Sequence, residues 1–471
     1  MKKKVISLLL VALLTGCGVS GSAHQNNDNS ASDAGDSSSA AQAVTTDEGN
    51  TYNDSASDAN DNKVTTADAS DIEISSADSS ESETSENEST AESSMEDNEM
   101  ATEITIPEIE IEQKDIPDNE SLSFVRDMKL GFNIGNTFDA FVDSGVNDDL
   151  TIETAWGNDK VTKEFIKAIH DNGFSTVRIP ISWHNHVDEN NKINEAWLDR
   201  VQEVVDYVVE EDMYVIINIH HDNHLEANGL YPDEEHKEQS LDYIESIWTQ
   251  LADRFKDYDN KLIFESMNEP RLVGHNNEWW IDPNNEDCKN AIAIINELNQ
   301  KFVDVVRASG GNNEDRYLMC PGYCASPDGV LNDGFVIPTD SADNKIILSI
   351  HAYTPYSFAL ESPGIDNFDA SSAASRKDID YFMENIYKKY ISQGIPVVIG
   401  ECGCVDKNGN LQDRVDWAAY YTAKAKSCGL PLLWWDNGAF SGNGELFGFI
   451  HRDDGTLEYP DMMKAMLKYM E

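Results

Sequence analysis

Short hydrophobic runs, each bounded by polar residues or glycine, recur along the chain from about residue 121 onwards. Runs of this kind are typical of strands that are buried on both faces. Eight of them can be distinguished: LGFNIG (130–135), STVRIPIS (175–182), YVIINIH (214–220), LIFESMN (262–268), YLMCPG (317–322), IILSIHAY (346–353), PVVIGEC (396–402) and LPLLWWD (430–436).

Amphipathic stretches lie between most of these runs. In the stretch 194–212, Trp197, Val201, Val204 and Val208 recur at the spacing of one helix face. Further helical stretches cover 237–256, 286–309, 373–392, 411–428 and 460–470. Eight buried strands separated by helices predict a (β/α)8 barrel, although a doubly wound sheet also alternates strands with helices.

Polar and aromatic residues gather where the hydrophobic runs end. Barrel enzymes build their active sites at the carboxyl ends of the strands, so these positions are the candidate site. The candidates are Asn136, Arg178, His220, His221, Asn268, Glu269, His351, Tyr353, Glu401 and Trp434.

Two of these candidates are glutamates that follow buried strands: Glu269 in FESMNEPR and Glu401 in VVIGECG. An ionised carboxylate is costly in such a place unless it has partners or a chemical task. Cleavage of a glycosidic bond requires two carboxyl groups, one that protonates the leaving oxygen and one that attacks the sugar or activates water. The alternative is that each glutamate only forms a salt bridge with an arginine.

The segment NIHHDNH (218–224) is dense enough in histidine to suggest zinc. Barrel metal sites draw ligands from several strand ends, commonly with a His-x-His on the first strand, and LGFNIGN contains no histidine. His220 and His221 are adjacent, so in an extended strand they point to opposite faces. Only one of the two can therefore easily face the barrel axis, and His224 lies in a loop without an assigned role. The sequence predicts neither a catalytic metal nor another cofactor.

Six motifs in a fixed order resemble glycoside hydrolase family 5. They are VRIPISW, INIHHD, MNEP, IHAYTP, IGECG and LLWWDNG. The segments GFNIGNTFDA and ETAWGN further resemble subfamily 4 of this family, bacterial endo-β-1,4-glucanases that often also act on xyloglucan or mixed-linkage glucan. The resemblance runs from about residue 121 to the C-terminus.

The resemblance implies a retaining mechanism in which Glu269 is the acid/base and Glu401 the nucleophile. Arg178 would lower the pKa of Glu401, and Tyr353 would donate a hydrogen bond to it. Asn268 resembles the asparagine that binds the sugar 2-hydroxyl. The resemblance also places His220 at the sugar site, with His221 as its support.

Further site residues follow by position. His351 lies two residues before Tyr353 and faces the same side of an extended chain. Asn136 is a candidate subsite contact. Trp434 is expected to offer a flat platform to a sugar ring, with a tryptophan of the core as the alternative. Trp435, of opposite strand parity, is expected to be structural.

Other functions stay open at this point. The chain could be a catalytically weak carbohydrate-binding lipoprotein of the cell surface, or a family 5 enzyme that acts on mannan or xylan. The aromatic pair in NNEWW (276–280) could form a further sugar subsite or pack within its loop.

The first residues predict export. MKKK, the apolar run 5–14 and LTGC (14–17) form a signal peptide of residues 1–16, too short to span a membrane. LTGC resembles the lipobox of bacterial lipoproteins, in which Cys17 becomes the lipidated N-terminus. The alternative is an ordinary signal peptide and a secreted protein.

The composition separates a linker from a catalytic domain. Residues 17–104 are rich in Ser, Asp and Glu and lack large apolar side chains, which predicts disorder, and residues 105–471 form the barrel. The net charge of −53 disfavours nucleic acid and anionic membranes as partners. The expected protein is a monomer that acts on neutral β-glucan, lies at the cell surface and contacts the membrane only through Cys17. The other six cysteines are expected to be mostly free thiols.

Overall fold

The computed structural model describes residues 103–142, 150–223, 229–442 and 444–470. The predicted signal peptide (1–16), most of the predicted linker (17–104) and His224 lie outside the described residues, so these predictions stay open. Among the described residues, no helix has the length and apolar character needed to cross a membrane.

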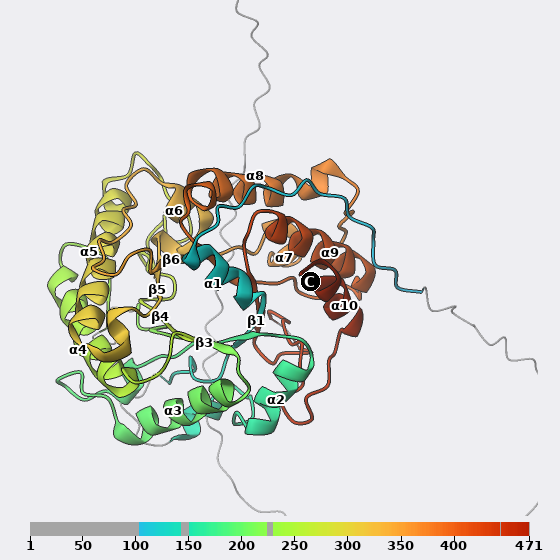
Figure 1. Cartoon of the computed structure of the whole chain (residues 1–471). Coiled ribbons are helices and arrows are strands. Elements are labelled where there is room, and N and C mark those ends of the chain that lie inside the picture. Colours follow the sequence, from blue (N-terminus) through green and yellow to red (C-terminus); the bar gives the residue numbers. More distant parts are fainter. Residues whose placement is uncertain (1–102, 143–149, 224–228, 443, 471) are drawn as a thin grey trace, which may run out of the picture. The chain divides into compact units, whose positions relative to one another are not determined.

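Eight parallel strands form a closed barrel, and each strand pairs with its neighbours in chain order (Figure 1). Each strand lies within one of the predicted hydrophobic runs, and this confirms the (β/α)8 fold. The strands are β1 (Leu130–Ile134), β2 (Thr176–Ile179), β3 (Tyr214–Asn218), β4 (Leu262–Glu265), β5 (Leu318–Pro321), β6 (Ile346–His351), β7 (Val397–Cys402) and β8 (Leu432–Asp436).

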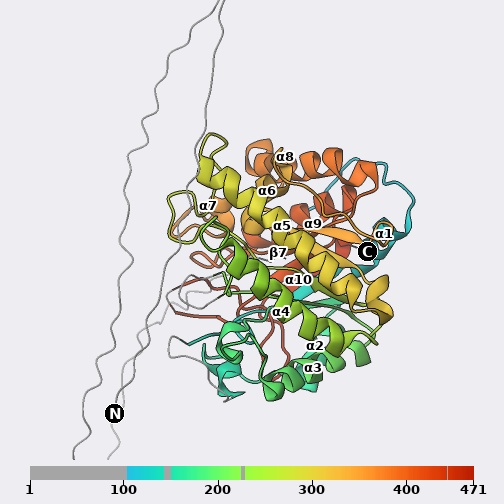
Figure 2. The same cartoon turned by 90° about the vertical axis from the view of Figure 1, so that its left-hand side faces the viewer.

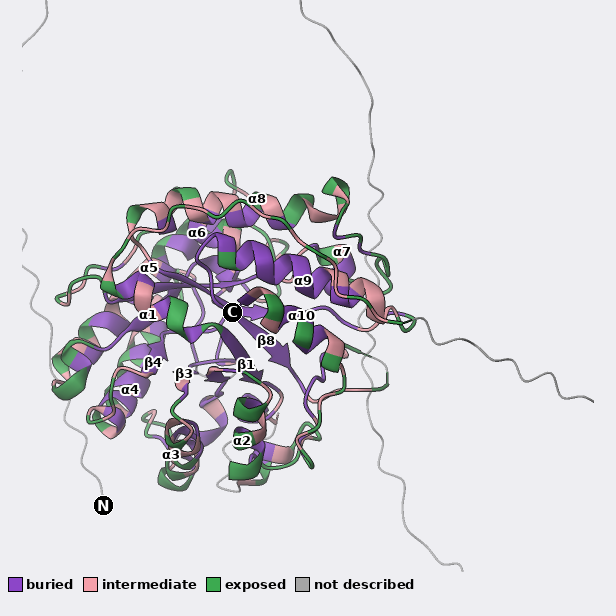
Figure 3. Ribbon diagram, turned by 45° about the vertical axis from the view of Figure 1, so that its right-hand side comes forward, coloured by how far each residue is buried: buried purple, intermediate pink, exposed green. Residues whose placement is uncertain are grey.

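Helices surround the barrel and turn their buried faces towards it (Figures 2 and 3). The six predicted helices are present with nearly the expected bounds: α3 (Glu195–Glu210), α4 (Lys237–Phe255), α5 (Glu286–Ala308), α8 (Ala373–Lys389), α9 (Leu411–Ser427) and α10 (Pro460–Met470). Shorter helices that the sequence analysis did not single out are α2 (Lys163–Asp171), α6 (Pro327–Leu331) and α7 (Tyr356–Ala359).

The amino-terminal end of the barrel is closed by α1 (Glu120–Met128). Val125 and Met128 of this helix belong to the same buried cluster as the inward side chains Ile216, Ile263 and Leu433 of the strands. This end of the barrel is therefore filled by apolar side chains, and the polar candidates lie towards the opposite end.

The segment before α1 is extended and packs against the last helices of the chain (Figure 1). The backbone N–H of Ile109 donates to the hydroxyl of Tyr469, and that of Lys114 donates to the carbonyl of Ser427 at 3.0 Å. The folded part thus includes residues from 103 onwards. The six cysteines after Cys17 are free and buried, as expected.

Candidate active site

Arg178, on β2, is the centre of the polar network at the carboxyl end of the barrel, and its side chain is fully buried. Its guanidinium donates to Glu401 Oε1 and Glu265 Oε2, both at 2.7 Å, to Asn268 Oδ1 at 2.8 Å and to Asn133 Oδ1 at 2.9 Å. Burial alone would lower the pKa of Arg178, but the two carboxylates outweigh it and raise the pKa. The arginine is therefore a permanent cation that fixes four neighbouring side chains.

Glu265 is a site residue that the sequence analysis missed. Its carboxylate is fully buried and also accepts from Ser349 Oγ at 2.6 Å and Asn218 Nδ2 at 3.0 Å. It lies inside the hydrophobic run of β4 rather than after it, so it was not noticed. The signal that identifies it is the alternation of side chains along a strand. Ile263 faces the barrel interior, so Glu265, two positions later, faces the interior as well.

Glu401 reaches the barrel axis because β7 is irregular at this point. The register of β7 shifts against both neighbouring strands next to Gly400 and Glu401. Such a bulge re-aims a side chain, and bulges are common beside active sites. Gly400 also leaves room for the site, since a Cβ there would lie 3.2 Å from His351 Nε2 and from Ser349 Oγ.

The two carboxylate oxygens of Glu401 have separate donors. Oε1 accepts from Arg178, and Oε2 accepts from the Tyr353 hydroxyl at 2.9 Å. Burial raises the pKa of Glu401, and although His351 and Arg178 oppose this, the pKa stays above its ordinary value. Arg178 thus acts in the expected direction, but it does not by itself bring the pKa below the ordinary range.

Glu269 lies beside His351, whose Nδ1 is 2.8 Å from Glu269 Oε1 and 3.6 Å from Glu401 Oε2. Burial would raise the pKa of Glu269, but the hydrogen bond and the charge of His351, together with the nearby Arg271 and His221, outweigh it, and the pKa is lowered. Burial lowers the pKa of His351, yet Glu401 and Glu269 raise it above its ordinary value. These two shifts favour the shared proton on His351, whereas the roles implied by the resemblance need it on Glu269.

His220 is a buried hydrogen-bond donor. Asn218 Oδ1 accepts from the backbone N–H of Ile181, so Asn218 Nδ2 faces His220 Nδ1 at 3.1 Å and donates to it. This leaves the ring proton of a neutral His220 on Nε2. Burial, followed by the nearby His221 and Arg178, lowers the pKa of His220 well below its ordinary value and keeps the ring neutral.

The side chains of the two tryptophans of β8 point in the opposite directions to those expected. Trp434 has 0% exposure, packs against Phe449 with ring centroids 4.8 Å apart and donates its N–H to Phe447. It therefore offers no ring face to a ligand, and the expectation for this residue is wrong. Trp435 pairs in register with the inward Asn133 and lies parallel to His220, with centroids 5.8 Å apart.

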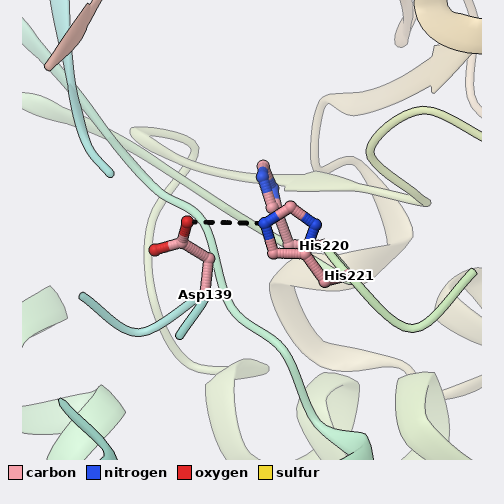
Figure 4. A group of neighbouring side chains, drawn as sticks. All are labelled: Asp139, His220 and His221. Atoms are coloured by element: carbon pink, nitrogen blue, oxygen red, sulfur yellow. Dashed lines mark ion pairs between the residues drawn. The ribbon is translucent and has the colours of Figure 1, made fainter. Parts of the chain in front are cut away.

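His221 and His220 both approach Asp139 (Figure 4). Alternation along a strand predicts opposite faces, but β3 ends at Asn218, and the two rings beyond it lie only 4.5 Å apart. Nε2 of His221 is 3.6 Å from Asp139 Oδ2. The separation predicted for this pair is thus wrong, because the rule holds only while the chain is extended.

The Asp139, His220 and His221 cluster does not fit a metal centre. A histidine ligand needs an unprotonated nitrogen towards the ion, whereas Asn218 fixes the proton of His220 on Nε2. The oxygens of Asp139 already accept from the backbone N–H groups of Thr137 and Asn136 at 2.7 and 3.1 Å. The donor set suits hydroxyl groups better than a cation.

Two further candidates lie at the rim. Asn268 is nearly buried, and because its Oδ1 is held by Arg178, its amide N–H groups are left for another partner. Asn136 is half-buried with a positive φ of 53°, and its backbone oxygen accepts from Asn158 at 3.0 Å. The structure therefore brings Arg178, Asn268, Glu269, His351, Tyr353 and Glu401 into one network, with His220 and His221 beside it and Asn136 at its edge.

A (β/α)8 barrel with a buried glutamate, a partly exposed glutamate and a histidine between them at its carboxyl end is the arrangement of a glycoside hydrolase. The family model described as cellulase, glycosyl hydrolase family 5, matches residues 144–441. Endoglucanase B of Neocallimastix patriciarum is 42% identical over 359 residues, which are 74% of this chain and 71% of that protein. Endoglucanase B of Ruminococcus albus is 40% identical over 371 residues, 77% of this chain and 85% of that protein.

Solved structures agree with this relationship. A GH5 family lichenase from Caldicellulosiruptor sp. F32 is 53% identical with a TM-score of 0.76 and covers 78% of this chain and 100% of its own. A GH5-4 broad specificity endoglucanase from Ruminococcus champanellensis, with bound cellotriose, is 41% identical with a TM-score of 0.69 and covers 75% and 100%. The chain belongs to glycosyl hydrolase family 5 and is a glycoside hydrolase of the endoglucanase class, which confirms the prediction from the motifs.

Proposed function

We propose that the protein cleaves internal β-1,4 bonds of glucan chains with retention of configuration, with Glu269 as acid/base and Glu401 as nucleophile. The observation that carries this proposal is the closeness of the two glutamates, whose nearest carboxylate oxygens lie within 4.8 Å. Inverting enzymes keep their carboxyl groups about 6.5–9.5 Å apart to admit a water molecule, whereas retaining enzymes keep them about 5–5.5 Å apart.

The fixed geometry of Glu401 suits a nucleophile. Arg178 holds one carboxylate oxygen and Tyr353 the other, so the group cannot rotate away from the sugar. In the first step a bond forms between a Glu401 oxygen and the anomeric carbon, while the bond from that carbon to the leaving oxygen breaks. In the second step water attacks the same carbon and releases Glu401.

The proton for the leaving oxygen comes from the His351 and Glu269 pair. Their 2.8 Å hydrogen bond lets the proton held by His351 move to Glu269. A sugar that covers the site excludes water from Glu269 and favours its neutral form. After the first step Glu269 is a carboxylate and takes a proton from the attacking water.

The sugar that is attacked would lie beside Trp435 and the histidines. The Nε2–H of His220 and the amide of Asn268 are donors for its hydroxyl groups, and Trp435 presents an aromatic ring. His221 and Asp139 add polar groups at the edge, with Asn136 further out. We assign no metal or other cofactor to this reaction.

The substrate is a β-1,4-linked glucan in this proposal. It is supported by the relatives named as endoglucanases and lichenase, one of them with cellotetraose in a mutant form. Cellulose-type chains, mixed-linkage glucan and xyloglucan are the candidates, and a panel with mannan and xylan added identifies the preferred polymer. A catalytically weak carbohydrate-binding protein would bind a polymer in the panel and release no reducing ends.

The direct test is the release of reducing ends from soluble β-1,4-glucan by the protein and by Glu401→Gln. We expect hydrolysis by the protein and a loss of at least about 10³-fold in the variant, because the covalent step needs an ionised oxygen. Binding without hydrolysis in the unaltered protein would leave the binding function instead. A loss of activity with EDTA would argue for a metal.

We further propose that the protein is exported and anchored at the outer cell surface by lipid on Cys17, with residues 1–16 removed and residues 17–104 as a linker to a monomeric catalytic domain (105–471). The support is the LTGC motif, the acidic composition and the polymeric substrate, which cannot cross a membrane. Labelling with radioactive palmitate tests the anchor, and Cys17→Ser should abolish the label. Resistance of the enzyme to protease added to intact cells would contradict an outward position.

A further inference from the structure

Asn133 lies in the middle of β1 and is fully buried, although its side chain is polar. It pairs in register with Arg178 on β2 and with Trp435 on β8, and like them it faces the barrel interior. A buried amide is costly unless its hydrogen-bonding groups have partners. The partners of Asn133 therefore show which parts of the site it holds.

The amide oxygen and the amide nitrogen of Asn133 bind different strands. Oδ1 accepts a hydrogen bond from Nη1 of Arg178 at 2.9 Å. Nδ2 donates to the carbonyl of Gly400 at 2.9 Å and to the carbonyl of Trp434 at 3.2 Å. An asparagine amide has two N–H donors, and both are used here. One side chain of β1 thus joins the arginine of β2 to the main chains of β7 and β8.

The hydrogen bond to Gly400 falls on the irregular part of β7. The register between β6 and β7 shifts next to Glu401 and skips Gly400. The register between β7 and β8 shifts in the same stretch. A bulge interrupts the regular pairing of the backbone and re-aims the side chain beside it, so its polar groups need other partners. Asn133 supplies a partner from two strands away, since β8 lies between β1 and β7.

Glu401 is therefore held in two ways by groups that Asn133 connects. Its side chain is held because Nη1 of Arg178 donates to Glu401 Oε1 at 2.7 Å as well as to Asn133. Its main chain is held because the carbonyl of the preceding residue, Gly400, accepts from Asn133. Loss of these links would let the carboxylate move away from the anomeric carbon, and a displacement of about 1 Å can slow a reaction about 10²-fold.

We propose that Asn133 is a positioning residue for the nucleophile, and that it keeps the β7 bulge and Arg178 in the arrangement that points Glu401 at the sugar. This inference rests on the proposed function, since it assumes that Glu401 attacks the anomeric carbon. Asn133 has no exposed surface and does not contact the sugar, so it acts only through these neighbours.

Asn133→Leu tests this role, because leucine has the same branched shape and forms none of the three hydrogen bonds. The probe is 2,4-dinitrophenyl 2-deoxy-2-fluoro-β-cellobioside, whose leaving group needs no proton and whose sugar stays bonded to the nucleophile. We expect the rate constant for trapping of Glu401 to fall about 10²-fold, with a similar fall in kcat on soluble glucan and less than about a threefold change in KM. Trapping at the rate of the unaltered protein would overturn the proposal.

Asn313 provides the matched control, because it is an equally buried asparagine that also holds an arginine. Its Oδ1 accepts from Nε of Arg316 at 2.6 Å, and its Nδ2 donates to the carbonyl of Ala252 at 2.8 Å. It precedes β5 and so lies towards the amino-terminal end of the barrel, away from Glu401. Asn313→Leu should lower the urea midpoint of unfolding but leave the trapping rate within about threefold. An equal fall in trapping in both variants would show that Asn133 has only a structural role.

Asn133→Asp separates the two links. Its carboxylate lies beside Arg178, is therefore ionised and still accepts from the guanidinium, but it has no hydrogen to donate to Gly400. We expect the trapping rate to fall about as far as in Asn133→Leu. Trapping at the rate of the unaltered protein would show that the hydrogen bond to the bulge is dispensable and would overturn the inference. If Asn133→Leu does not fold, this variant decides.

The same probe separates this inference from the proposed function. Mass spectrometry of the labelled peptide identifies the residue that is trapped in the unaltered protein. If Glu401 carries no label, the proposed function fails and the inference falls with it. If Glu401 is labelled and Asn133→Leu behaves like Asn313→Leu, only the inference fails.

Discussion

Arg178 and Glu265 form an ion pair at 2.7 Å, and neither side chain has any exposed surface. The pair lies beside Glu401, because the same guanidinium also holds Glu401 Oε1 at 2.7 Å. The buried Arg178 cation therefore has two carboxylate partners. Its electrostatic effect on Glu401 depends on whether Glu265 carries a negative charge. The arrangement makes Glu265 a determinant of both stability and activity, although it does not contact the sugar in the proposed mechanism.

Removal of the charge in Glu265→Gln should destabilise the protein by about 3–5 kcal/mol, because it leaves a buried cation with one carboxylate instead of two. It should also lower kcat, since Arg178 then binds Glu401 more strongly and makes it a weaker nucleophile. Urea unfolding and kcat on soluble glucan measure the two effects.

The matched control is Glu245→Gln, which removes an exposed carboxylate paired with Lys301 at 2.7 Å. Exposed pairs contribute little, so the free energy of unfolding should change by less than about 1 kcal/mol. If the two variants were equally stable, the buried pair would have no structural importance.

The pH profile of kcat/KM should be bell-shaped. Its acid limb should report the pKa of Glu401, and its alkaline limb the pKa of His351, which shares a proton with Glu269. Glu401 must be ionised, and burial raises its pKa, so activity is lost as the pH falls through a value above 4.5. The proton shared with Glu269 is held by His351, whose pKa is raised, so activity is lost as the pH rises through a value above 6.5. An acid limb below 4.5, or an alkaline limb below 6.5, would contradict these assignments.

The two tryptophans of β8 should respond differently to replacement by alanine. Trp435→Ala should weaken the binding of cellotetraose, measured by calorimetry in a Glu401→Gln background, because Trp435 faces the site. Trp434→Ala should instead lower the free energy of unfolding by about 3–5 kcal/mol, since it opens a cavity between β8 and α9. The reverse pattern, with weak binding in Trp434→Ala and a stable protein, would show that the barrel face is misassigned.

The sequence predicted the barrel well because strands buried on both faces are hydrophobic without interruption. All eight strands lie within the predicted runs, and the motifs placed Arg178, Glu269 and Glu401 at the ends of three of them. In the structure these residues do meet at one site. The resemblance of the motifs, rather than periodicity, suggested which chemistry they perform.

The periodicity of the sequence did not predict side-chain orientation where a strand ends or its register shifts by one residue. A hydrophobic run such as LPLLWWD gives no sign of which alternate set is inward, so Trp434 and Trp435 were exchanged. His221 turned towards His220 because the chain leaves the strand after Asn218. Glu401 points to the axis because of a bulge that no pattern in the sequence announces.

One carboxylate oxygen of Glu269 lies within 4.8 Å of one carboxylate oxygen of Glu401, which leaves no room for a water molecule to attack the sugar in the first step. Proton NMR of the anomeric signals during hydrolysis of a cello-oligosaccharide tests this most directly. We expect the β-anomer of the new reducing end to form first and then to mutarotate to the equilibrium mixture. Initial formation of the α-anomer would show inversion and would contradict the covalent role of Glu401.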